Sequence, residues 1–255
     1  MRSPALITSL ALFLSPLAFA ADGESTYEGS LSSSAANYVL GKPVSITHSS
    51  GNLAVRCMDT ESLTARVQYV VTGTAETAME TAGKGVGIAA YGDSNGGKVS
   101  TRVPSKGTGV SSVEITLTVN IPRAPITLTV TESGSGWVQV QDCDGTVKVS
   151  AGGGGAFVSG ELKGATVTAS GSDVKVVQNN GAVFTATTSV SAPGGNATLI
   201  LGTAQGGKLT AKGEEVAVGP TVMGTNTATL VSGDMGLAGP SITVSAKVRA
   251  EVSNP

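Results

Sequence analysis

Short stretches that alternate apolar and polar residues run through the chain between residues 126 and 186. Gly-rich turns separate these stretches, which read ITLTV, WVQV, TVKVS, AFVS, ATVTAS, VKVV and AVFTA. Alternation over about four or five residues, closed by a turn, predicts a β-strand with one buried side. The units recur every ten or eleven residues, which indicates a repeat architecture; the recurring positions are Ile126, Trp137, Val147, Phe157, Val167 and Val177.

The repeats predict an all-β fold, a β-solenoid or β-helix-like stack of short strands with Gly-rich turns. One such strand cannot bury its apolar side alone, whereas stacked units let Leu128, Val138 and Val147 form a continuous apolar column. Two strands and two turns per coil give about twenty residues per coil. A β-sandwich is the alternative, because it also has short strands at even spacing.

The pattern is looser before the repeats, where residues 38–125 form a β-rich N-terminal part. Residues 44–47 and 53–57 are predicted strands joined by the turn HSSGN. Residues 74–85 are the one predicted helix, and Thr77 and Glu80 within it have the spacing of a capping box. We expect this part to continue into the same sheet structure as the repeats.

The repeats and the residues after them, 126–255, form the predicted solenoid core and a C-terminal cap. Gly, Pro or Asn separates each strand-like segment from the next. The last segment, 241–252, has no Gly-rich turn after it. We expect it to cover the end of the stack, since an open end would present unpaired backbone groups.

Residues 1–20 have the features of a secretory signal peptide. Arg2 precedes the apolar run ALITSLALFLSPLAFA, which ends in the A-x-A pattern Ala18-Phe19-Ala20. The run is short and interrupted by proline, so it does not predict a membrane anchor. We expect an exported protein, periplasmic or extracellular, whose mature chain begins near Ala21 with a flexible Ser-rich leader over residues 21–37.

Composition narrows the range of partners. Charged residues make up 13% of the chain, and loss of Arg2 with the signal peptide leaves 15 basic against 18 acidic residues, a net charge of −3. Such a chain offers no basic patch for phosphates, so nucleic acid is not an expected partner. A surface of Thr, Ser and Gly suits cell-surface polysaccharide or envelope proteins.

Cys57 and Cys143 are the two cysteines. In an exported chain an even number of cysteines predicts a disulfide, which would close a loop of 86 residues (143 − 57). The alternative is two separate thiols, one on a strand and one in a turn.

The sequence does not predict catalytic residues, a metal site or a cofactor. His48, the only histidine, is predicted to lie in a solvated turn, with no G-x-S-x-G element nearby. Asp142 and Asp144 could hold Ca²⁺ or cleave a glycosidic bond, but Asp-Gly is a turn signal and we assign both to a turn. We therefore expect that the protein is not an enzyme.

Trp137 is the only tryptophan. If Val138 and Val140 point inward, alternation places Trp137 on the outer side of its strand. There it could stack on a sugar ring, or it could pack against a neighbouring segment of the chain, and packing is the simpler expectation.

Three motifs resemble those of the bacterial putative-adhesin domain family of uncharacterised function. They are Ser50-Gly51-Asn52-Leu53, which matches an early hairpin, Val119-Asn120-Ile121-Pro122, which matches a hinge, and the turns at Gly134, Gly145, Gly154, Gly164 and Gly171. The resemblance extends over roughly residues 44–231 and implies a β-helix-like fold, without implying an activity.

Together these features predict an exported, non-catalytic structural or adhesive module of the bacterial cell envelope or surface. The alternative is a carbohydrate-binding or carbohydrate-active β-helix protein, which rests on analogy of fold alone.

Overall fold

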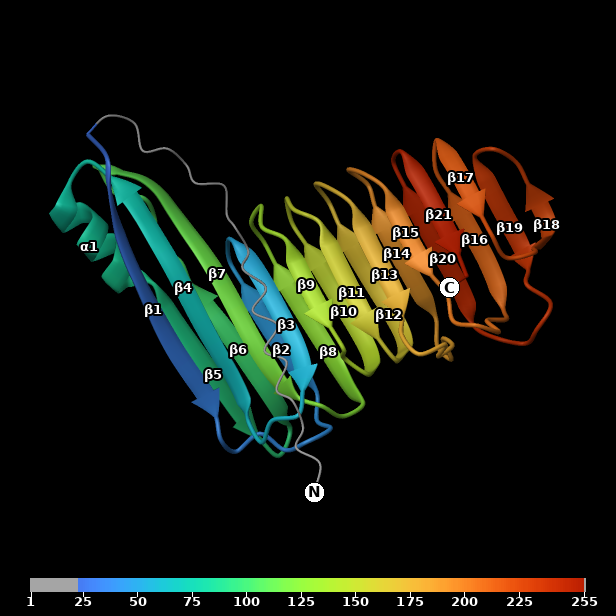
Figure 1. The fold of residues 1–255 in the computed structure, drawn as a ribbon, viewed down its shortest axis with the longest axis horizontal. Helices are drawn as coiled ribbons and strands as arrows, with labels where there is room; N and C mark the ends of the chain where they lie inside the picture. The colour runs from blue at the N-terminus through green and yellow to red at the C-terminus, as the bar shows by residue number, and fades with distance from the viewer. Residues whose placement is uncertain (1–22, 255) are drawn as a thin grey trace, which may run out of the picture.

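The computed structural model describes residues 23–254, so the predicted signal peptide lies outside the described residues. Apart from one helix, the regular secondary structure of the described chain is all β-strand (Figure 1). The elements are β1 Ser25–Ala35, β2 Val44–His48, β3 Asn52–Met58, β4 Leu63–Gly73, α1 Glu76–Gly85, β5 Gly87–Asp93, β6 Gly96–Arg102, β7 Val110–Pro122, β8 Ile126–Glu132, β9 Val138–Gln141, β10 Gly145–Ala151, β11 Ala156–Gly160, β12 Leu162–Ala169, β13 Val174–Gln178, β14 Thr188–Ala192, β15 Ala197–Ile200, β16 Lys208–Lys212, β17 Glu215–Val218, β18 Met223–Asn226, β19 Leu230–Asp234, β20 Ser241–Ala246 and β21 Arg249–Ser253.

The strands form two large mixed sheets. Sheet A has the order β1-β4-β7-β3-β9-β11-β13-β15-β21-β17, and sheet B has the order β18-β19-β16-β20-β14-β12-β10-β8-β2-β6-β5. From β8 to β15 the chain alternates between the two sheets, one strand at a time. Each strand in this region is therefore parallel to the strand two places earlier, and Figure 1 shows these strands following one another along the molecule.

The register of these parallel pairs fixes the length of chain between equivalent positions. Val147 lies opposite Leu128 on one side and opposite Ala165 on the other, and Val174 lies opposite Ala197. In each of these pairs the partners are about twenty residues apart in sequence, which is the expected length of one coil. The parallel pairs also show that the middle of the chain is not an antiparallel sandwich.

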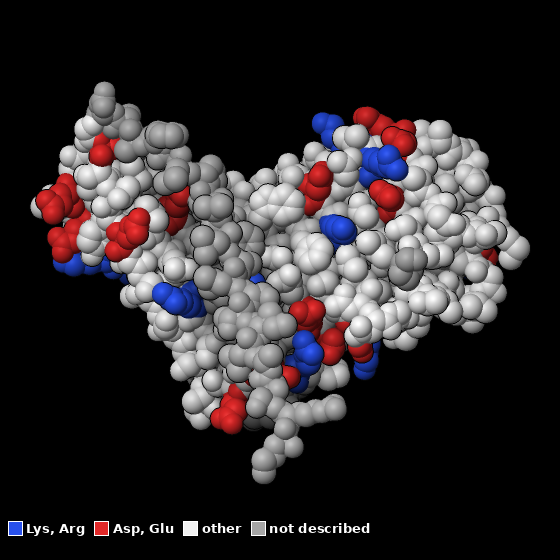
Figure 2. All heavy atoms as spheres, viewed as in Figure 1, with Lys and Arg blue, Asp and Glu red and all other residues white. Residues whose placement is uncertain are grey.

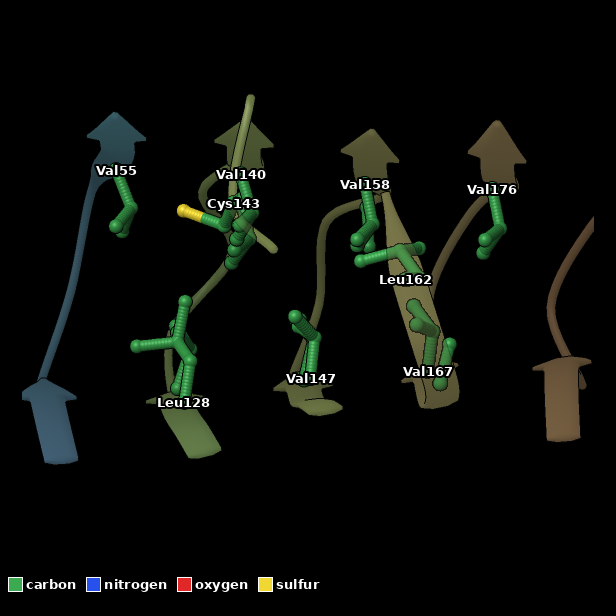
Figure 3. Close-up of a cluster of buried hydrophobic side chains, with 14 of the residues drawn as sticks. Val55, Leu128, Val140, Cys143, Val147, Val158, Leu162, Val167 and Val176 are labelled. Carbon is green, nitrogen blue, oxygen red and sulfur yellow. The ribbon is translucent and has the colours of Figure 1, made fainter. Parts of the chain in front are cut away.

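The core lies between the two sheets and is built from small branched side chains in columns. Val55, Val140, Val158 and Val176 are register partners on successive strands of sheet A, and all are fully buried. Figure 3 shows them pointing toward Leu128, Val147 and Val167 of sheet B. Burying each such side chain contributes about 1.5–3 kcal/mol. The expected apolar column is present in both sheets.

Antiparallel pairs occur at both ends of the stack, although the last strand of sheet A, β17, is parallel to β21. At the N-terminal end β1 pairs with β4, β4 with β7, and β5 with β6. At the C-terminal end β16 pairs with β19, and β19 with β18. The prediction that residues 241–252 would cap the stack is wrong. Instead β20 lies between β14 and β16, and β21 lies between β15 and β17, because the chain returns into the stack after β19.

Two further N-terminal expectations differ from the structure. Most of the predicted flexible leader is a strand, β1, which pairs with β4 over its whole length because backbone pairing outweighs the low strand preference of serine. The turn HSSGN does not form a hairpin. It leads the chain from sheet B to sheet A, since β2 pairs with β6 and β8, whereas β3 pairs with β7 and β9.

The predicted helix is present as α1, but its capping box is not. The N-cap residue is Ala75 and makes no side-chain hydrogen bond, while the Thr81 hydroxyl donates to the carbonyl of Thr77. Met79 of α1 packs with Val67 and Val71 in a second, smaller core beside the N-terminal strands. No helix among the described residues is long and apolar enough to cross a membrane.

Cys57 and Cys143 form a disulfide, with their Cα atoms 4.8 Å apart. Cys57 lies on β3, and Cys143 lies in the turn that follows β9. These strands are hydrogen-bonded neighbours in sheet A although five other strands and α1 separate them in sequence. The bond therefore ties the N-terminal part to the first strand that sheet A gains from the repeats.

Replacing both cysteines, with Cys57→Ala and Cys143→Ala, is expected to lower the free energy of unfolding by roughly 4–5 kcal/mol, because an 86-residue loop is no longer closed in the unfolded chain. Guanidinium unfolding followed by circular dichroism measures the change. Reduction with dithiothreitol should destabilise the wild type and leave the double variant unchanged. A loss below about 1 kcal/mol would contradict the loop-closure account.

Candidate functional site

A groove of about 400 Å³ lies on the outer face of sheet A, over β7, β3, β9 and β11. The lining residues are Asn52, Leu53, Ala54, Thr116, Trp137, Gln139 and Phe157. Except for Leu53, which is buried, their side chains alternate along the strands with core residues and so point away from the core. The groove is thus an aromatic and apolar surface interleaved with amides and a hydroxyl.

Trp137 is held by its neighbours on both sides. Its backbone N–H donates to Oδ1 of Asn52 at 3.0 Å, and its carbonyl accepts from the N–H of Leu53 at 2.8 Å. The indole lies over Gly155, where an added Cβ would come within 2.5 Å of Cη2 of the ring. Trp137 nevertheless remains 51% exposed. It is therefore packed and accessible at once, with glycine providing the room beneath the ring.

Phe157 and Gln139 extend the groove along one cross-strand row. Ala54 lies opposite Gln139, and Gln139 lies opposite Phe157. The side-chain oxygen Oε1 of Gln139 is buried and has no hydrogen-bond partner in the described structure. An unpaired buried amide oxygen costs about 1–3 kcal/mol, so Gln139 is held in this position at some cost to stability.

The groove offers binding groups and no proton donors or acceptors of catalytic type. None of its lining residues is an acid, a base or a cysteine. General acid–base catalysis requires a titratable group within hydrogen-bond reach of the substrate. Among the described residues, no three His, Cys, Asp or Glu side chains come together to hold a metal ion. In Figure 2 the charged side chains are scattered in small groups over the face in view, with wide uncharged stretches between them.

Asp142 and Asp144 lie in the turn after β9, away from the groove lining. Asp142 has a left-handed backbone, with φ of 56°, and its Oδ1 accepts a hydrogen bond from the Asn179 side chain. Oδ1 of Asp144 accepts from the N–H of Glu161. The two carboxylates therefore connect this turn to segments 37 and 17 residues further along the chain.

The placement of His48 in a solvated turn is wrong. His48 ends β2 and is fully buried, because it continues the inward-facing alternation of Val44 and Ile46. Its Nδ1 lies 2.8 Å from Oγ1 of Thr101, and its Nε2 is buried without a partner. Burial lowers the pKa of His48 to about 4. The alternation of β2 was the signal that could have located it.

Glu132 is a buried carboxylate that the sequence reasoning missed. It lies opposite His48 in the register of β2 and β8 and is only 1% exposed. Its carboxylate accepts hydrogen bonds from the N–H groups of Gly134, at 2.6 Å, and Gly152, at 3.4 Å. Burial raises the pKa of Glu132, opposed by these backbone donors, which lower it. Glu132 thereby fixes the turn that leads directly into Trp137.

No protein-family model matches the sequence, and no curated protein matches it. Among solved structures, the chain is similar to a putative cell adhesion protein from Clostridium sporogenes, at 13% identity and a TM-score of 0.44, over 91% of this chain and 100% of that one. It is similar to a putative adhesin from Bacteroides fragilis, at 11% identity and a TM-score of 0.42, over 92% and 98% of the two chains.

A third similar structure is a putative lipid binding protein from Parabacteroides distasonis, at 11% identity and a TM-score of 0.33, over 92% of this chain and 97% of that one. The low scores leave the assignment of function to the residues of the site itself.

The buried His48 should make stability depend on pH. Its pKa is about 4 in the folded protein and about 6.5 in the unfolded chain, so the unfolded chain binds the extra proton between these values. The free energy of unfolding should then fall by about 3 kcal/mol as pH decreases from 7 to 4. Urea unfolding at a series of pH values measures this loss.

His48→Asn is the matched variant, because an amide can keep the hydrogen bond to Thr101 without titrating. Its stability should depend less steeply on pH than that of the wild type over the same range. The raised pKa of Glu132 acts in the opposite sense, giving stability that is lost as pH rises through its folded value, but both proteins contain it. Equal slopes for the two proteins would contradict a neutral, buried His48.

Proposed function

We propose that the protein is an exported, non-catalytic surface module that holds an uncharged glycan in the Trp137 groove and so serves adhesion. The observation that supports this most directly is the half-exposed indole in an open groove. An aromatic face attracts the slightly positive C–H groups of a sugar ring, and the ring also buries apolar area on contact. Phe157 provides a second aromatic surface on the next strand of sheet A.

The polar residues of the groove favour a glycan over a lipid. Asn52, Thr116 and Gln139 lie between the aromatic side chains and can exchange hydrogen bonds with hydroxyl groups. An acyl chain has no hydrogen-bond donor or acceptor for these amides. Its binding would remove water from them without replacing the lost hydrogen bonds, which is unfavourable. An uncharged ligand also matches the lining, which contains no charged residue.

The scaffold that we propose for this site is a β-solenoid. The chain alternates between the two sheets, and its parallel partners lie about twenty residues apart, which supports a coil-by-coil winding. Such a stack holds side chains of successive coils at about 4.8 Å spacing. A rigid row of this kind suits repeated contact with a polymer more than it suits closure around a small substrate.

The absence of an acid or base from the groove lining supports a non-catalytic role. A carbohydrate-active enzyme would need titratable groups beside the bound sugar, and Asp142 and Asp144 lie in a turn outside the groove. We therefore favour retention of a glycan over its cleavage.

Trp137 is the only tryptophan, so intrinsic fluorescence of the mature protein reports on the groove directly. Titration with maltohexaose, cellohexaose and chitohexaose should change the emission with at least one of them. Phe157→Ala keeps the reporter and should weaken binding about tenfold, since one aromatic contact is worth roughly 0.5–1.5 kcal/mol beyond its area. Trp137→Ala, followed by calorimetry, should weaken it at least as much.

Val248→Ala is the control, because Val248 is 45% exposed and lies outside the groove. Its affinity should equal that of the wild type. Binding that survives both aromatic substitutions would remove the groove from the proposal. Release of new reducing ends from any of the three oligosaccharides would contradict a non-catalytic role.

A further inference from the structure

β1 is the outermost strand of sheet A, and one of its edges has no partner among the described residues. Its eleven residues pair with β4 on the other edge in a register without a bulge. No backbone hydrogen bond joins its free edge to another described segment. The strand therefore presents a straight row of backbone donors and acceptors at the left of the molecule in Figure 1.

The other three sheet edges are short or covered. At the edge of β17, the N–H groups of Val216 and Gly213 donate to the carbonyls of Ala228 and Thr229. At the edge of β5, the N–H of Ala90 donates to the Ser33 hydroxyl. β18 has only four residues. Proteins usually blunt free edges in such ways, or with proline, lysine or a bulge. β1 contains no proline, lysine or bulge, and although α1 and β5 pack against it, neither pairs with its backbone.

Leu31 indicates that the edge is incomplete. It lies opposite Val67 in the register of β1 and β4, and thus on the side of sheet A that faces the core. Val67 is fully buried, whereas Leu31 is 38% exposed. The difference arises because no further strand follows β1. An added strand would cover Leu31 and satisfy the free backbone groups together.

We propose that β1 pairs in antiparallel fashion with β1 of a second copy of this chain, with Leu31 at the two-fold axis. An isologous interface needs a surface that is complementary to itself, and this register provides one. Glu28 would lie opposite the second copy's Ser34, and Ser30 opposite its Ser32, because both pairs are centred on Leu31. No like charges face each other, and small hydroxyl side chains allow close approach.

The two copies of sheet A would then form one continuous sheet with two Trp137 grooves on it. This pairing rests on the geometry of β1 and does not depend on what the groove binds. A different protein supplying the strand would leave the isolated chain monomeric, which separates that case from pairing of two copies.

Leu31→Cys tests the register, because no free cysteine is present among the described residues. Opposed residues in antiparallel strands have Cα atoms about 4.5–5.5 Å apart, within the range of roughly 4.4–6.8 Å that suits a disulfide. Mild oxidation of the mature variant should give a covalent dimer on a non-reducing gel. Leu237→Cys, at a position 57% exposed near the opposite end of the stack, should remain monomeric under the same conditions.

Sedimentation of the unmodified mature protein gives the second measurement. We expect a concentration-dependent dimer, and Leu31→Lys should weaken it at least tenfold because two like charges would meet at the axis. Leu237→Lys should leave it unchanged. A wild-type monomer at 100 µM, equal cross-linking of the two cysteine variants, or a dimer indifferent to Leu31→Lys would each overturn the proposal.

Discussion

The structure depends on parallel, in-register stacking of strands whose partners are about twenty residues apart in sequence. Each inward side chain packs on its register partner in the next parallel strand, so the core grows along one direction and needs no large residues. Aromatic residues make up 4% of the chain, and valine fills many of the central positions instead. Branched side chains lose little rotamer freedom in strands, so burying them in such a column costs little conformational entropy.

The same stacking explains where polar groups enter the core. The inward corner position that holds His48 and Glu132 on β2 and β8 holds Ala151 and Ala169 on β10 and β12. In the later strands a small alanine side chain occupies this position. On β8 the larger carboxylate of Glu132 occupies it and accepts hydrogen bonds from the N–H groups of Gly134 and Gly152. The short turn between β8 and Trp137 joins the polar corner at Glu132 to the aromatic groove.

Alternation in the sequence predicted most of the strands, the apolar columns and the outward placement of Trp137, because a period of two depends only on local backbone geometry. The alternation did not predict features that depend on pairing with residues distant in sequence. The Ser-rich composition of β1 hid a strand that β4 stabilises. His48 is a different case, because the local alternation Val44-Ile46-His48 already placed it inward and the adjoining turn residues obscured this. The groove could be predicted only as an exposed tryptophan, since Asn52, Thr116 and Phe157 reach it through pairings that no local pattern encodes.

The position of β20 and β21 inside the stack has a consequence for the order in which the chain can fold. β16 to β19 come before them in sequence, yet β16 and β17 cannot join either sheet until these last strands have been inserted beside β14 and β15. β4 likewise precedes β7 in sequence, yet it reaches β3 in sheet A only through β7. Both ends of the stack therefore contain strands that are connected to the rest of a sheet through a strand later in the sequence.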